Sequence, residues 1–197
     1  SREGEADIDK GVAREEKQAA LAAFDSLVRE EVPVDLCLVD ESARSAEALN
    51  GDEATALPTG QVRLNRGLAA FQDSPEGAAG GWWVQDFGAH LPIAALGDLR
   101  GTTAIDLCAA PGGKTLQLAR AGAEVTAVDN SGPRLERLSE NLARTGLRAA
   151  VKKIDVLKYT HKPVDLVVLD APCSASGTFR KNPEAPWLRS PVTLLEH

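Results

Sequence analysis

The sequence predicts an α/β protein with a parallel, doubly wound sheet, preceded by a small α+β unit. Two observations in the second half of the chain carry this prediction. Four apolar segments of strand length occur there, and helical segments separate the first three. Aspartates or small-residue loops follow several of these strands. Strands that alternate with helices form right-handed βαβ units, and ligands bind beyond the carboxyl ends of such strands.

The elements of the second half are expected in a regular order. Trp82 and Trp83 open it with an aromatic turn, which leads into a helix that ends near residue 96. Strands are then expected at 103–108, 124–129, 149–155 and 164–169, with helices at 114–121 and 133–145. The pattern favours the spatial strand order 3-2-1-4.

The first half reads as a helix followed by a smaller unit. Leu21, Phe24, Leu27 and Val28 recur at helical spacing within 14–31, and Pro33 ends that segment. Strands are expected at 34–39 and 60–64, a helix at 42–49, and a linker or loop region at 67–81, which is rich in Gly, Ala and Pro. The expected division is therefore a connector at 1–31, a small α+β unit at 32–80, and a larger domain at 81–197.

Composition narrows the class of protein. The 197 residues carry a net charge of −7, but residues 1–100 carry −10 and residues 101–197 carry +3. Local charge matters more than the total for a polyanionic partner, so nucleic acid is permitted. No apolar run approaches the length of a membrane span, so no membrane partner is expected. Three cysteines without a Cys-x-x-Cys pair argue against disulfides or a metal site, and favour a reducing cytoplasm.

The loop Ala109-Ala110-Pro111-Gly112-Gly113 joins the first predicted strand to its helix. Small residues let a ligand approach the backbone, and N–H groups at a helix start suit an anion. Lys114 in the first turn opposes the helix dipole, which hints at a compensating anion such as a ligand carboxylate or phosphate. A phosphate-binding P-loop is excluded because Cys108 stands where its first glycine belongs, and the dinucleotide fingerprint is absent.

Three aspartates close later strands. Asp129 ends the second strand, where a ribose-binding acid sits in doubly wound folds. Asp155 ends the third strand and is a candidate acceptor for an adenine amino group, while Asp170 follows the fourth. Each is also a candidate loop acid or helix cap. Because all three are expected at the same edge of the sheet, a role in ligand binding is favoured.

The motifs resemble one family. Asp106-Leu-Cys-Ala-Ala-Pro-Gly-Gly-Lys-Thr115, Ala127-Val-Asp129, Asp170-Ala-Pro-Cys-Ser174 with Gly177 and Arg180-Lys-Asn-Pro-Glu184, and Val84-Gln85-Asp86 are similar to the Sun/Fmu (RsmB-type) RNA cytosine-C5 methyltransferases. The resemblance covers about residues 32–197. It implies a Rossmann-like sheet of seven strands, of which four lie in this chain, and S-adenosylmethionine as cofactor. It also implies cytosine C5 methylation in RNA, with 16S ribosomal RNA as the expected partner and a monomer as the expected state.

The resemblance also implies roles for residues of this chain. The expected cofactor-binding residues are Cys108, Ala109, Ala110, Pro111, Gly112, Gly113, Lys114, Asp129, Arg134, Asp155 and Asp170. Asp170 is expected to contact the base, and Cys173 to assist breakdown of a covalent RNA adduct. Arg180, Lys181 and Arg189 are candidate RNA phosphate contacts. In the family the attacking thiol belongs to a later Thr-Cys motif, which is absent from these 197 residues; Cys37 and Cys108 are not expected to replace it.

Two other functions stay open at this point. One is a catalytically inactive module that binds S-adenosylmethionine and serves as an RNA scaffold. The other is C5 methylation of tRNA or another RNA, since the motifs are shared. The chain begins at Ser1 and contains no methionine, so we expect it to be a piece of a longer protein whose chain continues beyond His197.

Overall fold

The computed structural model describes residues 14, 16–19, 22, 33–40, 54–65 and 67–173. The chain divides into two units. One comprises Ser1–Val32 and Pro172–His197, and the other is Pro33–Ala171. In the first unit, residues 14, 16–19 and 22 are helical, within the helix predicted at 14–31. The helix predicted at 42–49 lies outside the described residues, and the predicted domain boundary after residue 80 stays a prediction.

The second unit contains the predicted parallel sheet. Its strands are β5 (Thr103–Leu107), β6 (Glu124–Asp129), β7 (Ala150–Lys153) and β8 (Leu166–Leu169). They pair in the order β7-β6-β5-β8, and every neighbouring pair is parallel. The predicted order 3-2-1-4 and all four strands are therefore confirmed, with ends that differ by at most two residues. All four carboxyl ends consequently lie at one edge of the sheet.

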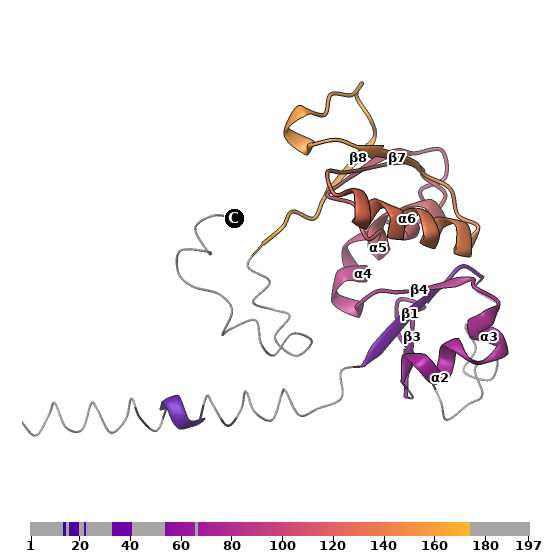
Figure 1. Ribbon diagram of the computed structural model, residues 1–197, viewed down its shortest axis with the longest axis vertical. Coiled ribbons are helices and arrows are strands. Elements are labelled where there is room, and N and C mark those ends of the chain that lie inside the picture. The colour runs from indigo at the N-terminus through magenta and orange to yellow at the C-terminus, as the bar shows by residue number, and fades with distance from the viewer. Residues whose placement is uncertain are drawn as a thin grey trace, which may run out of the picture. The chain divides into compact units, whose positions relative to one another are not determined.

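Helices α5 (Gly113–Arg120) and α6 (Gly132–Thr145) connect the first three of these strands and lie on the same face of the sheet (Figure 1). Leu135, Leu138 and Leu142 recur at helical spacing in α6, and each is less than 10% exposed. They pack with Leu116 of α5 and Ala127 of β6 in one apolar cluster. The periodicity that predicted the helix is thus the face that it buries.

The second unit also contains a small sheet of four antiparallel strands, in the order β2-β3-β1-β4. Its strands are β1 (Val34–Leu38), β2 (Ala54–Ala56), β3 (Val62–Leu64) and β4 (Trp82–Val84). The aromatic turn predicted at Trp82 and Trp83 is wrong, because these residues form β4, and Trp83 lies opposite Cys37 of β1. Both tryptophans are buried. Aromatic residues favour strands, and burying two indoles against the sheet is favourable, so this pair forms a strand and not a turn.

The linker predicted at 67–81 is also wrong. It contains two short helices, α2 (Leu68–Gln72) and α3 (Pro75–Ala78). Ser74 caps α3 by accepting a hydrogen bond from the Gly77 amide at 3.2 Å, and Pro75 occupies the first helical position. Phe71 of α2 is buried edge-on against Trp82. One cap and one aromatic anchor order a segment whose composition is typical of loops.

Helix α4 (Phe87–Ala94) follows β4 directly and connects the two sheets. Its first amide, from Phe87, donates to the Asp35 carboxylate of β1 at 3.0 Å. The same carboxylate accepts two hydrogen bonds from Arg63 of β3, at 2.7 and 3.0 Å. Asp35 therefore fixes where α4 begins relative to the small sheet. Among the described residues, no helix has the length and apolar character needed to cross a bilayer.

Arg144 joins α6 to the small sheet. Its guanidinium lies 4.3 Å from the ring centre of Trp82 and donates to the carbonyl oxygens of Gly80 and Trp82. Asn141, one turn earlier in α6, accepts a further hydrogen bond at 2.8 Å. Arg144 therefore connects α6 to β4 through Trp82.

We therefore expect Arg144→Ala to lower the free energy of unfolding by about 2 kcal/mol, because a cation–π contact and two hydrogen bonds to carbonyls are lost together. Urea denaturation measures this change. Arg137→Ala, on an exposed position of the same helix, is the matched control and should change stability by less than about 0.5 kcal/mol. Equal effects of the two substitutions would contradict a specific role for Arg144.

Candidate cofactor-binding site

The loop between β5 and α5 passes close beneath α6. Cys108 has a φ of 59° and Gly112 a φ of 112°, so the backbone turns sharply at both ends of the loop. A Cβ at Gly112 would overlap the Leu138 side chain of α6. Glycine is therefore required at this position both for its backbone conformation and for the close approach to α6. The result is a strand–loop–helix turn with little side-chain bulk over its backbone.

Asp129, the last residue of β6, holds this loop. Its carboxylate accepts a hydrogen bond from the Ala110 amide at 3.1 Å and another from the Ser131 amide at 2.9 Å. The Arg134 guanidinium lies 3.6 Å from the same carboxylate and donates to the Ala110 carbonyl oxygen. The Asp129 side chain is only 2% exposed, whereas that of Arg134 is 47% exposed. The predicted ribose acid thus organises the loop, and each of its oxygens retains a second lone pair.

Asp106 is a buried acid in β5, and its side chain contacts the first turn of α5. The Thr115 hydroxyl donates to its carboxylate at 2.6 Å, and Asp106 is 1% exposed. Burial raises the pKa of the Asp106 carboxyl to about 6, and the Thr115 hydrogen bond and the Lys114 charge only partly oppose this effect. Asp106 therefore anchors the first turn of α5 from the interior of the sheet.

Lys114 and Asp170 form an ion pair at the edge of the sheet. The Lys114 Nζ lies 2.6 Å from an Asp170 carboxylate oxygen. Lys114 is in the first turn of α5, where the helix dipole disfavours a cation, and Asp170 directly follows β8. The compensating anion expected beside Lys114 is thus a side chain of the protein. This contact brings the end of β8 against the start of α5.

The remaining site residues fall into three groups. Asp155 follows β7, and its carboxylate accepts from the Leu157 amide at 2.9 Å, which makes it the cap of a short 3-10 helix, Val156–Lys158. Cys173 is exposed and belongs to the unit formed by Ser1–Val32 and Pro172–His197. Arg180, Lys181 and Arg189 lie outside the described residues.

Neither of the two other cysteines has the surroundings of a nucleophile. Cys37 Sγ lies 3.3 Å from His90 Nδ1, a pairing that can activate a thiol. Burial, however, raises the pKa of Cys37 to about 12 and lowers the pKa of His90. Burial and the nearby Asp129 charge also raise the pKa of Cys108. Both groups are therefore held as thiols near neutral pH, which agrees with the expectation that neither replaces the attacking thiol.

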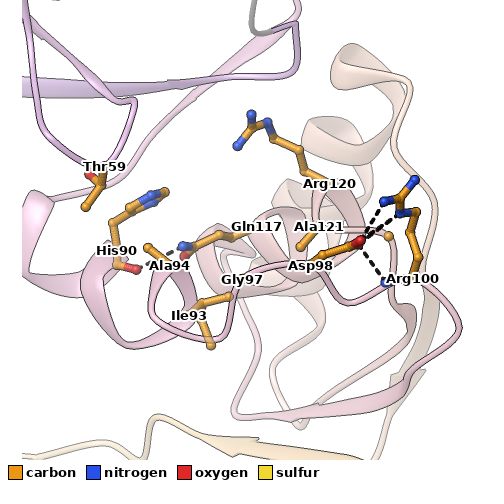
Figure 2. Close-up of a pocket in the computed structure, with 11 residues that line it drawn as sticks. Thr59, His90, Ile93, Ala94, Gly97, Asp98, Arg100, Gln117, Arg120 and Ala121 are labelled. Carbon is orange, nitrogen blue, oxygen red and sulfur yellow. Dashed lines mark hydrogen bonds and ion pairs between the residues drawn. The ribbon is translucent and has the colours of Figure 1, made fainter.

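A separate cavity of about 610 Å³ lies at the opposite edge of the sheet. It is lined by residues that precede β5 and β6, including Gly97, Arg100 and Gly122, and by His90 and Gln117 (Figure 2). These positions are at the amino ends of the parallel strands. Ligands in doubly wound sheets bind at the carboxyl ends, so the loop after β5, and not this cavity, is the candidate cofactor site.

The structure also reveals site residues without an assigned role in the sequence analysis. Asp106 and Thr115 belong to the motif at 106–115, and their hydrogen bond gives them an anchoring role that depends on the burial of Asp106. Gln85 and Gln117 form a hydrogen bond of 3.0 Å beneath the loop. They are 32 positions apart, so no local pattern predicts their contact.

A parallel sheet of this order, with a small-residue loop after its central strand and carboxylates after its neighbours, is the arrangement expected of a Rossmann-like S-adenosylmethionine-dependent methyltransferase. Residues 94–197, more than half of the chain, match the family described as 16S rRNA methyltransferase RsmB/F. The chain therefore belongs to this family, as its motifs indicated.

Curated relatives and solved structures agree with this assignment. Ribosomal RNA small subunit methyltransferase B of Salmonella arizonae is 44% identical over 128 residues, which cover 61% of this chain and 30% of that protein. The protein of the same name from Serratia proteamaculans is 42% identical over 134 residues, which cover 64% of this chain and 31% of that protein. The chain thus spans about 30% of the length of these relatives.

The crystal structure of PH0851 matches 88% of this chain and 42% of its own, with a TM-score of 0.77 and 27% identity. The structure of a methyltransferase homologue from Pyrococcus horikoshii matches 79% of this chain and 55% of its own, with a TM-score of 0.64 and 24% identity. This match supports the fold.

Asp106 should make stability depend on pH. Its folded pKa of about 6 lies above the ordinary value of 3.8, so the ionised carboxyl lowers stability above pH 6. The penalty of about 3 kcal/mol is relieved as the pH falls from about 6 to about 4. Asp106→Asn should therefore be more stable than the unmodified protein at pH 7.5, and the difference should shrink towards pH 4.

Thermal unfolding at several pH values measures this difference. Asp98→Asn is the control with the opposite sign, because hydrogen bonds from Arg100 lower the pKa of the exposed Asp98. A stability difference between Asp106→Asn and the unmodified protein that stays constant from pH 4 to pH 7.5 would contradict the account.

Proposed function

We propose that the protein containing this chain transfers a methyl group from S-adenosylmethionine to C5 of a cytosine in RNA, with 16S ribosomal RNA as the substrate. The observation that carries this proposal is the meeting of the loop after β5, Asp129 and the Lys114–Asp170 pair at one edge of the sheet. Membership of the RsmB/F family supports the RNA substrate. We further propose that the protein acts as a monomer in the cytoplasm.

The described residues fit the cofactor. The small residues of the loop carry little side-chain bulk that could keep a ligand from the backbone, and Gly112 lets the loop pack against Leu138 of α6. Asp129 and Asp155 retain lone pairs for hydroxyl or amino donors of a nucleoside. The proposed contact with the cofactor is completed by the other residues of the loop: Cys108, Ala109, Ala110, Pro111 and Gly113. Arg134 is half exposed, and its side chain can move to admit the cofactor.

The chemistry explains what the residues of this chain contribute. Bound S-adenosylmethionine supplies an electrophilic methyl group. Addition of a thiolate at C6 makes cytosine C5 nucleophilic. C5 would then take the methyl group as its bond to the donor sulfur breaks and S-adenosylhomocysteine is released. Removal of the C5 proton by a base would restore the C5–C6 double bond and expel the thiolate. Asp170, ordered by Lys114, is proposed to hold the cytosine ring. Cys173 is proposed to assist adduct breakdown.

The attacking thiol is proposed to come from the Thr-Cys motif of the whole protein. The raised pKa values of Cys37 and Cys108 support this division of roles, because neither group forms a thiolate easily near neutral pH. The target base must leave its stack to reach the site. Arg180, Lys181 and Arg189 are proposed to contact phosphates of that RNA.

Methyl transfer from labelled S-adenosylmethionine to unmodified 16S RNA by the full-length protein tests the proposal, with nucleoside analysis of the product. The expected product is 5-methylcytidine. Cys173→Ala should accumulate a covalent protein–RNA adduct that survives denaturing electrophoresis, because breakdown is slowed. Cys37→Ser is the matched control, since its buried sulfur takes no part in the reaction; it should turn over without trapped adduct.

The outcomes separate the alternatives. Donor binding without methyl transfer to any RNA would favour an inactive scaffold, and transfer to tRNA alone would change the substrate. A Cys173→Ala protein with normal turnover and no adduct would remove Cys173 from the mechanism.

A further inference from the structure

A one-way chain of hydrogen bonds runs between the two sheets beneath the cofactor loop. The Trp83 indole donates to Gln85 Oε1 at 3.0 Å, Gln85 Nε2 donates to Gln117 Oε1 at 3.0 Å, and Gln117 Nε2 donates to the His90 carbonyl oxygen at 2.9 Å. The last of these bonds is drawn in Figure 2. None of the four residues is more than 6% exposed.

The direction of this chain is fixed by its two ends. An indole N–H can only donate, so Gln85 must present its oxygen to Trp83. A carbonyl oxygen can only accept, so Gln117 must present its amide nitrogen to His90. Gln85 Nε2 makes a second bond, to the Ala89 carbonyl at 3.3 Å, and Gln85 Oε1 also accepts from Cys37 Sγ at 3.6 Å. The Gln85 amide is therefore fully engaged in one orientation, and neither glutamine can turn over.

Gln85 also lies beside the start of α5. A Cβ built at Gly113, the first residue of α5, would lie 3.5 Å from the Gln85 Cδ. Gln117 stands one turn further along the same helix. The Gln85 amide thus supports the helix start and is hydrogen-bonded to its second turn. Because Gly113 immediately follows Gly112, a shift of Gln85 would reach the loop from the α5 side, while Asp129 anchors the loop at Ala110.

We propose that Gln85 is a positioning residue for the cofactor loop: through Gln117 and Gly113 it holds the backbone of residues 111–113 in the conformation that receives the methyl donor. This inference rests on the proposed function. Gln85 acts on the loop from the interior and has no contact with the donor itself. It also connects β4 of the small sheet to the cofactor helix, which no local feature of the sequence indicates.

Gln85→Glu is the sharpest test because it changes one atom and almost no volume. A carboxylate oxygen would replace Nε2 and face two acceptors, Gln117 Oε1 and the Ala89 carbonyl oxygen, and Gln117 cannot turn to donate. The start of α5 should then move away. We expect the KM for S-adenosylmethionine to rise about tenfold, with kcat at saturating donor and the KM for RNA changed less than about twofold.

Gln61→Glu is the matched control. Gln61 is 1% exposed in the same polar cluster, and its amide donates to the Gln85 main-chain oxygen at 2.6 Å and to Cys37 Sγ at 3.4 Å. The same chemical change there should lower the melting temperature of the protein and, because it reaches the loop only through the Gln85 main chain, raise the KM for the donor much less than Gln85→Glu does. Should Gln85→Glu fail to fold, Gln85→Met, which removes the hydrogen bonds without adding charge, takes its place.

Kinetics of the full-length protein and calorimetric titration with S-adenosylmethionine are measured on all variants. A selective loss of donor affinity at position 85 supports the proposal. Unchanged donor affinity in the position 85 variant, or equal losses at positions 61 and 85, would overturn it and leave Gln85 as a stabilising residue only. Failure of the unmodified protein to bind the donor would instead refute the proposed function, so the two failures are distinguishable.

Discussion

The carboxylate of Asp129 is the interaction on which the candidate site depends. It lies at the end of β6 and accepts hydrogen bonds from the loop after β5 and from the residue that precedes α6. One buried group thereby fixes two strand–helix connections at adjacent strand ends. Without it, the Ala110 amide would lose its partner in a buried position, which costs about 1–3 kcal/mol. The loop geometry and the close packing on Leu138 follow from this anchor.

The site combines groups that are unfavourable individually. Asp106 is an acid in the interior, and Lys114 is a cation at the positive end of a helix. Each is offset by a specific partner, Thr115 for the acid and Asp170 for the lysine. Such paired compensation is common at functional sites, where groups are held ready for a ligand at some cost to stability.

The sequence predicts the parallel sheet well, because apolar strands, helical leucine spacing and strand-end aspartates are all local patterns. The strand order follows from the handedness of βαβ connections, so it too could be predicted. The errors at 67–81 and at Trp82 have one cause. The order in those segments comes from the Ser74 cap, from the packing of Phe71 on Trp82 and from the pairing of β4 with β1. Leu36 and Val84, which are partners in that pairing, are 48 positions apart (84 minus 36), so no local window contains both. The Gln85–Gln117 contact escapes prediction for the same reason.

The most direct test of the central claim is a crystal structure of the full-length protein with S-adenosylhomocysteine. We expect the nucleoside to lie at the carboxyl ends of β5 and β6, with its ribose bonded to Asp129 and its amino-acid part beside residues 111–114. A ligand in the cavity at the opposite edge, near His90 and Arg100 (Figure 2), would contradict the account.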